Sequence, residues 1–212
     1  MTTRQRKTPV RATADLKQDR AIRTRAQTLH VAAKLFAEQG FRATSMQHVA
    51  ERLGMTKGAV YFHFPTKESL AVAIVEEHYG RWPMVVKEVQ AEGLSPMRTA
   101  EEILNRAAVA FRDDPVMQAG ARLQLERPHI DAELPTPYLE WTQLLTSLLV
   151  TARYSGELRP GIDPEAGARA LVSAFFGMQH ISDVLAHRAD IVERWNEVRD
   201  LTFYALRCDQ ER

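Results

Sequence analysis

Apolar residues recur at helical spacing along nearly the whole chain. Between residues 20 and 39 they fall three or four positions apart, at Ile22, Ala26, Leu29, Ala33 and Phe36. This period places them on one face of an α-helix, and Gly40 is a residue that commonly ends such a helix. A second, shorter apolar face covers residues 46 to 53 and is closed by Gly54. Before it, Thr44 and Gln47 have the spacing of a capping box.

Capping residues predict where the other helices begin. Thr56 can cap a short third helix, and Thr66 can cap a long fourth one. Further helices are expected where a capping residue is followed by proline, at Ser95-Pro96, Asp114-Pro115, Thr136-Pro137 and Asp163-Pro164. Asp190 is expected to cap the last helix. The pattern therefore predicts an all-α protein of nine helices, in which the fourth helix joins two parts of the molecule.

Residues 49 to 60 have the anatomy of a helix-turn-helix. Ala50 is small where two helices must cross closely, and Gly54 can take the left-handed conformation that the turn requires. The positions that would pack inside such a unit are all apolar: Val49, Leu53, Met55 and Val60. Because these requirements are met together, the segment predicts a DNA-binding motif rather than an ordinary helical hairpin.

The outward side chains of this motif are the candidates for contact with DNA. The second helix of a helix-turn-helix lies in the major groove, where Gly58 and Ala59 would allow a close approach while Lys57 reaches guanine. Residues at the starts of the second and fourth helices are expected to meet phosphates. For Phe62, packing in the core is an equally open alternative. The predicted set is Thr44, Ser45, Thr56, Lys57, Gly58, Ala59, Tyr61, Phe62, His63 and Lys67.

The distribution of charge supports this prediction. The formal net charge is only +1, but residues 1 to 68 hold 13 of the 28 basic and 5 of the 27 acidic residues, a net charge of +8. The remainder therefore carries −7. A basic first part suits a polyanionic partner. We accordingly expect a basic, flexible arm over residues 1–19, a DNA-binding domain over 20–66 and a separate body over 67–212.

Composition argues against several other classes of protein. The longest stretch without a charged residue has thirteen residues, from Ala170 to Ser182, which is too short to cross a bilayer. The basic first residues lack an apolar segment, so we expect a cytoplasmic protein, associated with the nucleoid when bound to DNA. Cys208 is the one cysteine, which excludes an internal disulfide. Motifs for metal hydrolysis, phosphate loops, dinucleotide binding and nucleophile elbows are absent, and we expect neither a cofactor nor catalysis.

Three polar residues near the C-terminus permit two interpretations. His180, Asp183 and His187 share one face of a helix and have spacing that could suit a metal ion. We favour the second interpretation, in which they are polar positions on a helix that takes part in dimerisation. The apolar residues expected to build that contact between two subunits include Ile191, Trp195, Val198 and Ala205 of the last helix.

Residues 56–70, T-K-G-A-V-Y-F-H-F-P-T-K-E-S-L, resemble the signature of the TetR family of transcriptional repressors, and residues 42–70 fit it throughout. The resemblance implies a homodimer with an N-terminal three-helix DNA-binding head and a C-terminal body for ligand binding and dimerisation. Within that family, residues 114–123 and 137–141 are similar to the γ-butyrolactone and furan autoregulator receptors of antibiotic-producing actinomycetes.

This second resemblance implies a ligand pocket. Tyr79, Gln124 and Tyr138 match positions that line the pocket in receptors of the furan type, and Trp141 matches the pocket tryptophan of the butyrolactone branch. Trp82 and Met178 complete the expected set. Met178 stands where some butyrolactone receptors carry a hydroxyl side chain, which favours a furan or butenolide ligand. Tyr79 also precedes Gly80 and Pro83, which predict a bend in the fourth helix.

The function implied is that of a repressor bound to a pseudo-palindromic operator. A diffusible signalling molecule would release it and so control antibiotic genes; a furan carboxylic acid, a butenolide and a γ-butyrolactone are the candidate ligands. Three alternatives stay open. The protein could be a regulator of the same fold that answers to an antibiotic or to no ligand, an architectural DNA-binding protein, or a helical enzyme that uses a cofactor.

Overall fold

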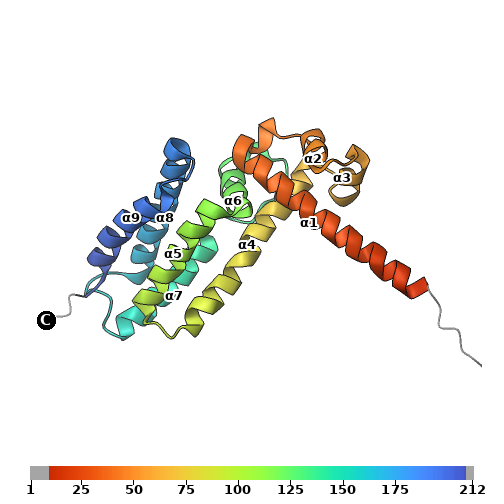
Figure 1. Ribbon diagram of the computed structural model, residues 1–212. Helices are drawn as coiled ribbons and strands as arrows, with labels where there is room; N and C mark the ends of the chain where they lie inside the picture. Colours follow the sequence, from red (N-terminus) through yellow and green to blue (C-terminus); the bar gives the residue numbers. More distant parts are fainter. Residues whose placement is uncertain (1–9, 209–212) are drawn as a thin grey trace, which may run out of the picture.

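The computed structural model describes the backbone of residues 10–208 and the side chains of residues 16–208. Its α-helices are α1 (Val10–Ala43), α2 (Met46–Leu53), α3 (Lys57–His63), α4 (Lys67–Ala91), α5 (Pro96–Asp113), α6 (Pro115–Leu125), α7 (Leu139–Tyr154), α8 (Pro164–Ala186) and α9 (Ile191–Leu206). A short 3₁₀ turn, η1 (Arg127–His129), follows α6. The prediction of an all-α fold with nine helices is confirmed for the described residues (Figure 1).

Helix α1 begins earlier than the sequence pattern indicated. It starts at Val10, so residues 10–19 of the expected flexible arm are helical, while residues 1–9 lie outside the described part of the chain. The physical reason is that residues 10–39 contain neither glycine nor proline, so nothing interrupts the helix. Its regular course is broken at Gly40, where φ is 80°, as predicted. Figure 1 shows the N-terminal half of α1 extending away from the rest of the molecule.

Side-chain caps fix the starts of the three helices that follow. Thr56 Oγ1 accepts a hydrogen bond from the Ala59 amide at 3.3 Å, and Thr66 forms a reciprocal capping box with Ser69 at the start of α4. The cap of α2 is Ser45 rather than Thr44, because Thr44 is buried and its hydroxyl donates to the Gly40 carbonyl at 2.8 Å. The cap expected at Thr44 is therefore wrong by one residue, and the Gln47 side chain binds Glu51 instead of closing a capping box.

The predicted capping residue and proline pairs open α5, α6 and α8, but not α7. Tyr138 adopts a left-handed conformation with φ of 65°, which a helix cannot include, so α7 begins only at Leu139 and not at Pro137. Asp190 does precede α9, yet its carboxylate binds Ser182 and Arg194 instead of the helix amides. Helix α4 continues without interruption through Gly80 and Pro83, and the bend expected there stays a prediction.

The helices pack around two apolar cores. One core belongs to the head, which consists of α1, α2 and α3 with the first half of α4, and the other to the body of α5, α7, α8 and α9. Helix α4 contributes Leu70 and Ile74 to the first core and Trp82 and Val89 to the second, so it joins the two parts, as predicted. Helix α6 also touches both, because Leu123 packs in the head while Met117 packs in the body.

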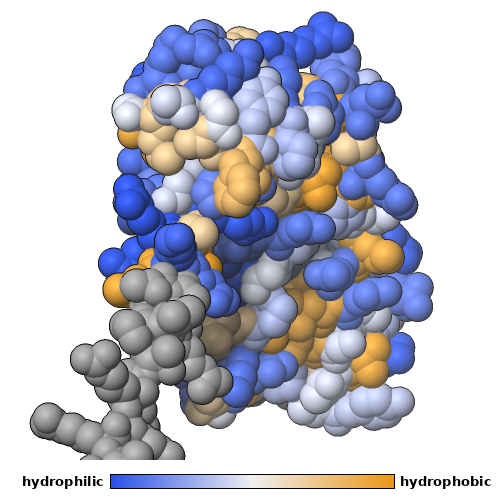
Figure 2. All heavy atoms as spheres, turned by 90° about the vertical axis from the view of Figure 1, so that its right-hand side faces the viewer, coloured by the Kyte–Doolittle hydropathy of each residue, from blue (hydrophilic) through white to orange (hydrophobic). Residues whose placement is uncertain are grey.

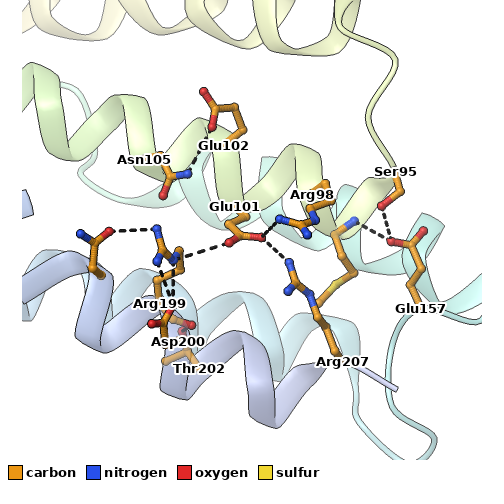
Figure 3. Close-up of polar contacts among 12 residues, drawn as sticks. Ser95, Arg98, Glu101, Glu102, Asn105, Glu157, Arg199, Asp200, Thr202 and Arg207 are labelled. Carbon is orange, nitrogen blue, oxygen red and sulfur yellow. Dashed lines mark hydrogen bonds and ion pairs between the residues drawn. The ribbon is translucent and has the colours of Figure 1, made fainter. Parts of the chain in front are cut away.

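A polar cluster ties the far end of the body together. Glu101 of α5 forms ion pairs with Arg98 at 3.6 Å, with Arg199 of α9 at 3.5 Å, and with Arg207 just after α9 (Figure 3). Glu157, in the connection from α7 to α8, accepts a hydrogen bond from the Ser95 hydroxyl at 2.6 Å. These contacts hold the ends of α5, α7 and α9 in a fixed relation, at the opposite end of the body from α6.

Hydrophilic side chains cover much of the surface on the side that carries the head. Seen from the right-hand side of Figure 1, the upper part of the molecule is mainly hydrophilic and larger apolar areas lie lower on the same face (Figure 2). No helix among the described residues is long and apolar enough to cross a membrane.

Candidate DNA-binding surface and ligand pocket

Helix α3 is held by its inner face and presents its outer face to solvent. Val60 is fully buried in the head core, and Phe64, directly after the helix, is buried beside it. On the outer face, Lys57 and Gly58 are exposed, and the Lys57 ammonium lies 5.4 Å from the centroid of the Tyr61 ring. The inner and outer residues thus fall where the sequence predicted, in an arrangement that can enter a groove.

The position of Phe62 decides between the two roles left open by the sequence, which were contact with DNA and packing in the core. Its side chain is 79% exposed, so it is not a core residue, and its ring meets the edge of the His63 ring at a centroid distance of 5.2 Å. Phe64, two residues later, fills the core position instead. A large apolar side chain exposed on a recognition helix is costly in water, and contact with thymine methyl groups is one role that would explain it.

The turn between α2 and α3 has the geometry of a helix-turn-helix. Gly54 has a φ of 63°, and its amide donates to the carbonyls of Ala50 and Glu51. The Met55 amide donates to the Ala50 carbonyl at 3.0 Å. Because only glycine adopts this conformation without strain, Gly54 fixes the angle between the two helices.

The structure corrects one expected phosphate contact and gives a second expected residue a partner inside the protein. The Thr44 side chain is buried and bound to Gly40, so its hydroxyl does not face a DNA backbone. The Lys67 ammonium donates to the Phe41 carbonyl at 2.8 Å and lies 4.1 Å from the centroid of the Phe41 ring. Lys67 therefore ties the start of α4 to the end of α1. Ser45 remains at the start of α2, where its hydroxyl caps the helix.

Four of the six predicted pocket residues surround one cavity in the body. Tyr79 of α4, Gln124 of α6, Tyr138 before α7 and Trp141 within α7 line it, together with Phe176 of α8. The free space is about 20 Å³, enough for about one water molecule. The structure is thus a nearly closed state of this site, and a ligand of ordinary size can enter only if the walls move apart.

One wall of the cavity is a connected polar group. The Gln124 side-chain amide donates to the Tyr79 hydroxyl at 3.3 Å and to the Pro135 carbonyl at 2.9 Å, while Arg127 donates to the Gln124 oxygen at 3.3 Å. Burial raises the pKa of Tyr79 to about 12, so its phenol keeps its proton at neutral pH. Burial also raises the pKa of Tyr138, whose ring lies 4.8 Å from that of Phe176.

The other two predicted pocket residues lie elsewhere. Trp82 lines a neighbouring groove of about 190 Å³, with Pro83 and Leu144 among its walls. It contacts two residues of the cavity, with ring-centroid distances of 4.9 Å to Trp141 and 6.0 Å to His78. Met178 is buried in the body core and lines neither space. The reason is geometric: successive helix positions differ by about 100°, which turns Met178 inward.

Two buried polar residues of the cavity were missed from the sequence. His78 of α4 and Gln179 of α8 both line it and are almost fully buried. Burial lowers the pKa of His78 to about 4, against the opposing effect of the Met117 carbonyl, so its ring is neutral at pH 7. A signal did exist for Gln179, because it lies four residues after Phe175 and three after Phe176, which makes it a polar residue on an apolar face.

His180, Asp183 and His187 line a cleft of about 740 Å³ between α6, α8 and the end of α1. An Asp183 carboxylate oxygen lies 2.9 Å from the Arg188 guanidinium, a contact between opposite charges that lacks the alignment of a hydrogen bond. Within residues 16–208 no three or more histidine, cysteine or carboxylate side chains are grouped so as to hold a metal ion.

Three of the four residues expected to form the dimer contact face the interior of their own subunit. Ile191 and Trp195 are buried in the core of their own subunit, and Trp195 Nε1 donates to Asn105 at 2.8 Å. Val198 packs against the same core, while Ala205 alone of the four is exposed. The choice of face on α9 was therefore wrong. Exposed apolar side chains of α8 and α9 are instead Ile181, Val184, Leu185, Leu201 and Tyr204.

Helices α1 to α3 thus define a helix-turn-helix DNA-binding domain, which α4 and α6 join to an all-helical body. Comparison with known families places the protein within this class. Residues 29–74 match the model of the bacterial regulatory proteins of the tetR family, and residues 94–206 match the tetracyclin repressor-like C-terminal domain. The chain belongs to the TetR family and is a transcriptional regulator, not an enzyme.

Relatives of known structure or name agree with this membership. A structure described as the molecular basis for control of antibiotic production by bacterial hormones is 64% identical, with a TM-score of 0.82, over 88% of this chain and 99% of the other. CprB from S. coelicolor A3(2) is 29% identical, with a TM-score of 0.78, over 90% of this chain and 92% of that one. The A-factor receptor protein of Streptomyces griseus is 31% identical over 86% of this chain, which spans 64% of that receptor.

Proposed function

We propose that this regulator represses transcription as a homodimer on a pseudo-palindromic operator and is released by a small signalling molecule. The single observation that carries the proposal is the position of the cavity. Tyr79 and Gln124 lie on α4 and α6, the two helices that also pack into the DNA-binding head. A ligand that separates these helices would therefore act on the head without touching DNA.

The outer face of α3 supports operator binding. Lys57 offers a cation for guanine, the small Gly58 and Ala59 allow a close approach, and Tyr61 and His63 can meet phosphates. In a dimer, the two copies of α3 would have to lie about 34 Å apart to enter successive major grooves. We assign the dimer contact to the exposed apolar side chains of α8 and α9 named above, which water disfavours in a monomer.

A direct route exists from the cavity to the head. Helix α6 carries Gln124 toward the cavity, and its Arg122 donates to the carbonyls of Ala37 and Glu38, at 2.9 and 3.1 Å, near the end of α1. Glu126 accepts a hydrogen bond from the Phe41 amide at 2.6 Å. A shift of α6 would therefore pull on α1 and change the distance between the two heads of a dimer.

The energy required for such a switch is modest. Moving the equilibrium from 1:99 to 99:1 needs about 5.5 kcal/mol of differential affinity, or roughly 2.7 kcal/mol for each of two ligands. Because the cavity of about 20 Å³ is nearly closed, a ligand binds only the opened form. Selectivity between the two forms then follows from the volume of the ligand itself.

The class of ligand rests on resemblance. The relatives include a receptor for A-factor and structures described as γ-butyrolactone receptors, 28% identical with a TM-score of 0.69 in one case. We propose a furan carboxylic acid, a butenolide or a γ-butyrolactone, acting on antibiotic genes. The sequence preference for furans or butenolides depended on Met178, and it loses its basis because Met178 does not line the cavity.

The test is retardation of operator DNA in a gel, using fragments that contain pseudo-palindromes selected by the purified protein. Wild-type protein should retard the fragment, and addition of an alkylated γ-butyrolactone or furan carboxylic acid should release it. A fragment retained under all these compounds, but released by an antibiotic, would favour a drug-responsive regulator of the same fold. Retention under every compound would favour a ligand-independent DNA-binding protein.

A further inference from the structure

The side-chain amide of Gln179 lies beside the cavity and has no hydrogen-bond partner among the described residues. Gln179 is only 4% exposed, and no described residue forms a hydrogen bond with its side chain. It lines the cavity from α8, next to Phe176. The Nδ1 atom of His78, on helix α4, also lacks a hydrogen-bond partner in the described part of the chain, but this atom packs against Gly120 of α6. Buried polar groups in folded proteins are rarely left in this condition.

The contrast with Gln124 is informative. The Gln124 amide already donates to Tyr79 and to Pro135, so a ligand that bound it would first have to break these bonds. Gln179 offers two N–H donors and one acceptor oxygen that are all available. A ligand group that binds the Gln179 amide therefore gains a hydrogen bond without first breaking one inside the protein.

The size and the charge of the cavity limit the kinds of ligand group that can bind there. The cavity can hold about one water molecule, which would supply the missing hydrogen bonds while no ligand is present. Its lining contains no lysine or arginine, and the His78 ring can accept a hydrogen bond as well as donate one. A hydroxyl group both donates and accepts, so it is the ligand group that matches either residue best.

We propose that Gln179, with His78 opposite, is a specificity-determining contact of the ligand site and that it binds a hydroxyl group on an otherwise apolar signalling molecule. This inference rests on the proposed function. It assigns to the ligand a polar contact that is separate from the wall formed by Tyr79 and Gln124.

The test compares probes that differ by one hydroxyl group. One pair is a γ-butyrolactone bearing a 1-hydroxyalkyl chain and its 1-deoxy analogue; the other is an alkylated furan carboxylic acid with and without a hydroxymethyl substituent. Release from operator DNA is measured for wild type, for Gln179→Leu and for Gln143→Leu, a control at an exposed position of α7. Leucine lacks the amide and is one heavy atom smaller than glutamine, so the substitution removes the hydrogen-bonding group without adding bulk to the cavity.

Wild type and the Gln143→Leu control should respond to the hydroxylated probe at about one tenth of the concentration needed for its analogue. In Gln179→Leu this difference should disappear, with the response to the deoxy probe unchanged. A tenfold preference that survives in Gln179→Leu would overturn the inference while leaving the proposed function intact. If no probe releases wild type, the proposed function fails for these ligand classes, and the inference fails with it.

Thermal unfolding gives a readout that needs no ligand. Because the amide has no protein partner, Gln179→Leu should unfold at the same temperature as wild type or at a higher one. A clearly lower unfolding temperature, at unchanged helicity, would mean that the amide supports the fold, and it would overturn the inference.

Discussion

The head and the body use their polar residues in opposite ways. In the head, Ser45, Thr56 and Thr66 satisfy the helix ends, and the side chains expected to function point outward from a filled core. In the body, the polar residues of interest line a cavity, and the buried Nδ1 atom of His78 has no hydrogen-bond partner among the described residues. A surface that must match DNA gains from rigidity. A ligand site that acts as a switch instead needs hydrogen-bonding groups that only the ligand-bound form satisfies.

The largest expected effect concerns the outer face of the head. Replacing Lys57 by Ala removes a cation from each of two recognition helices, which should cost about 2 to 6 kcal/mol of operator affinity if each contacts guanine at both acceptors. Gel retardation with a salt series measures the loss. Lys87→Ala, at an exposed position of α4 in the body, is the control and should bind like wild type. Equal binding by both variants would contradict the assignment of α3 to the groove.

Local signals were sufficient to predict the head. The capping hydroxyls, the left-handed Gly54 and the buried Val60 depend on residues within one or two turns, so the sequence determines them directly. Thr44 was misjudged, and the bond from Lys67 to the Phe41 carbonyl was not foreseen, because the end of α1 lies against both residues and helical spacing does not reveal that contact. The exposure of Phe62 likewise depends on the choice of Phe64 as the core residue.

The body was harder to predict because an apolar helix face there can pack either on the core of its own subunit or on another subunit. Helix periodicity identified an apolar side of α9, but it could not distinguish a face that packs on α5 from one that meets another subunit, so Trp195 was misassigned. Four pocket residues were found by resemblance to a family, whereas Gln179 belongs to no motif and was marked only by its place on an apolar face of α8. The Gln179 amide is available to a ligand only because no neighbouring group forms a hydrogen bond with it, and only a structure shows that.

The pH dependence of stability should separate the body from the head. The folded state holds the pKa of His78 at about 4, below its ordinary value of 6.5, because burial disfavours the charged ring. This contribution is full above pH 6.5 and is lost as the pH falls toward 4, since only the unfolded chain binds the proton in that range. The loss amounts to about 3 kcal/mol. Chemical denaturation of His78→Asn should change less between pH 6.5 and 4 than wild type, while His30→Asn, exposed on α1, should follow wild type.

A smaller effect is expected where α4 packs closely on α6. A β-carbon at Gly120 would lie 2.5 Å from Cγ and 2.6 Å from Cβ of His78, so Gly120→Ala must push the two helices apart. Such overpacking costs about 1 to 3 kcal/mol, despite the better helix propensity of alanine. The control is Gly177→Ala on α8, where a β-carbon meets open space and should stabilise by about 1 kcal/mol. If Gly120→Ala were as stable as Gly177→Ala in thermal unfolding, the close packing of α4 on α6 would be wrong.

The smallest expected effect lies within the polar wall of the cavity. Tyr79→Phe removes the hydroxyl that accepts from Gln124 but leaves the other bonds of that amide in place, so stability should change by only about 1 kcal/mol. Operator affinity should stay at the wild-type value, because Tyr79 lies in the body and not on α3. The ligand concentration needed for release should rise by up to about tenfold if the phenol also binds the ligand. Tyr154→Phe, at an exposed position of α7, is the matched control. A Tyr79→Phe variant that lost operator binding would mean that this wall supports the head itself, and the division of tasks between head and body would not hold.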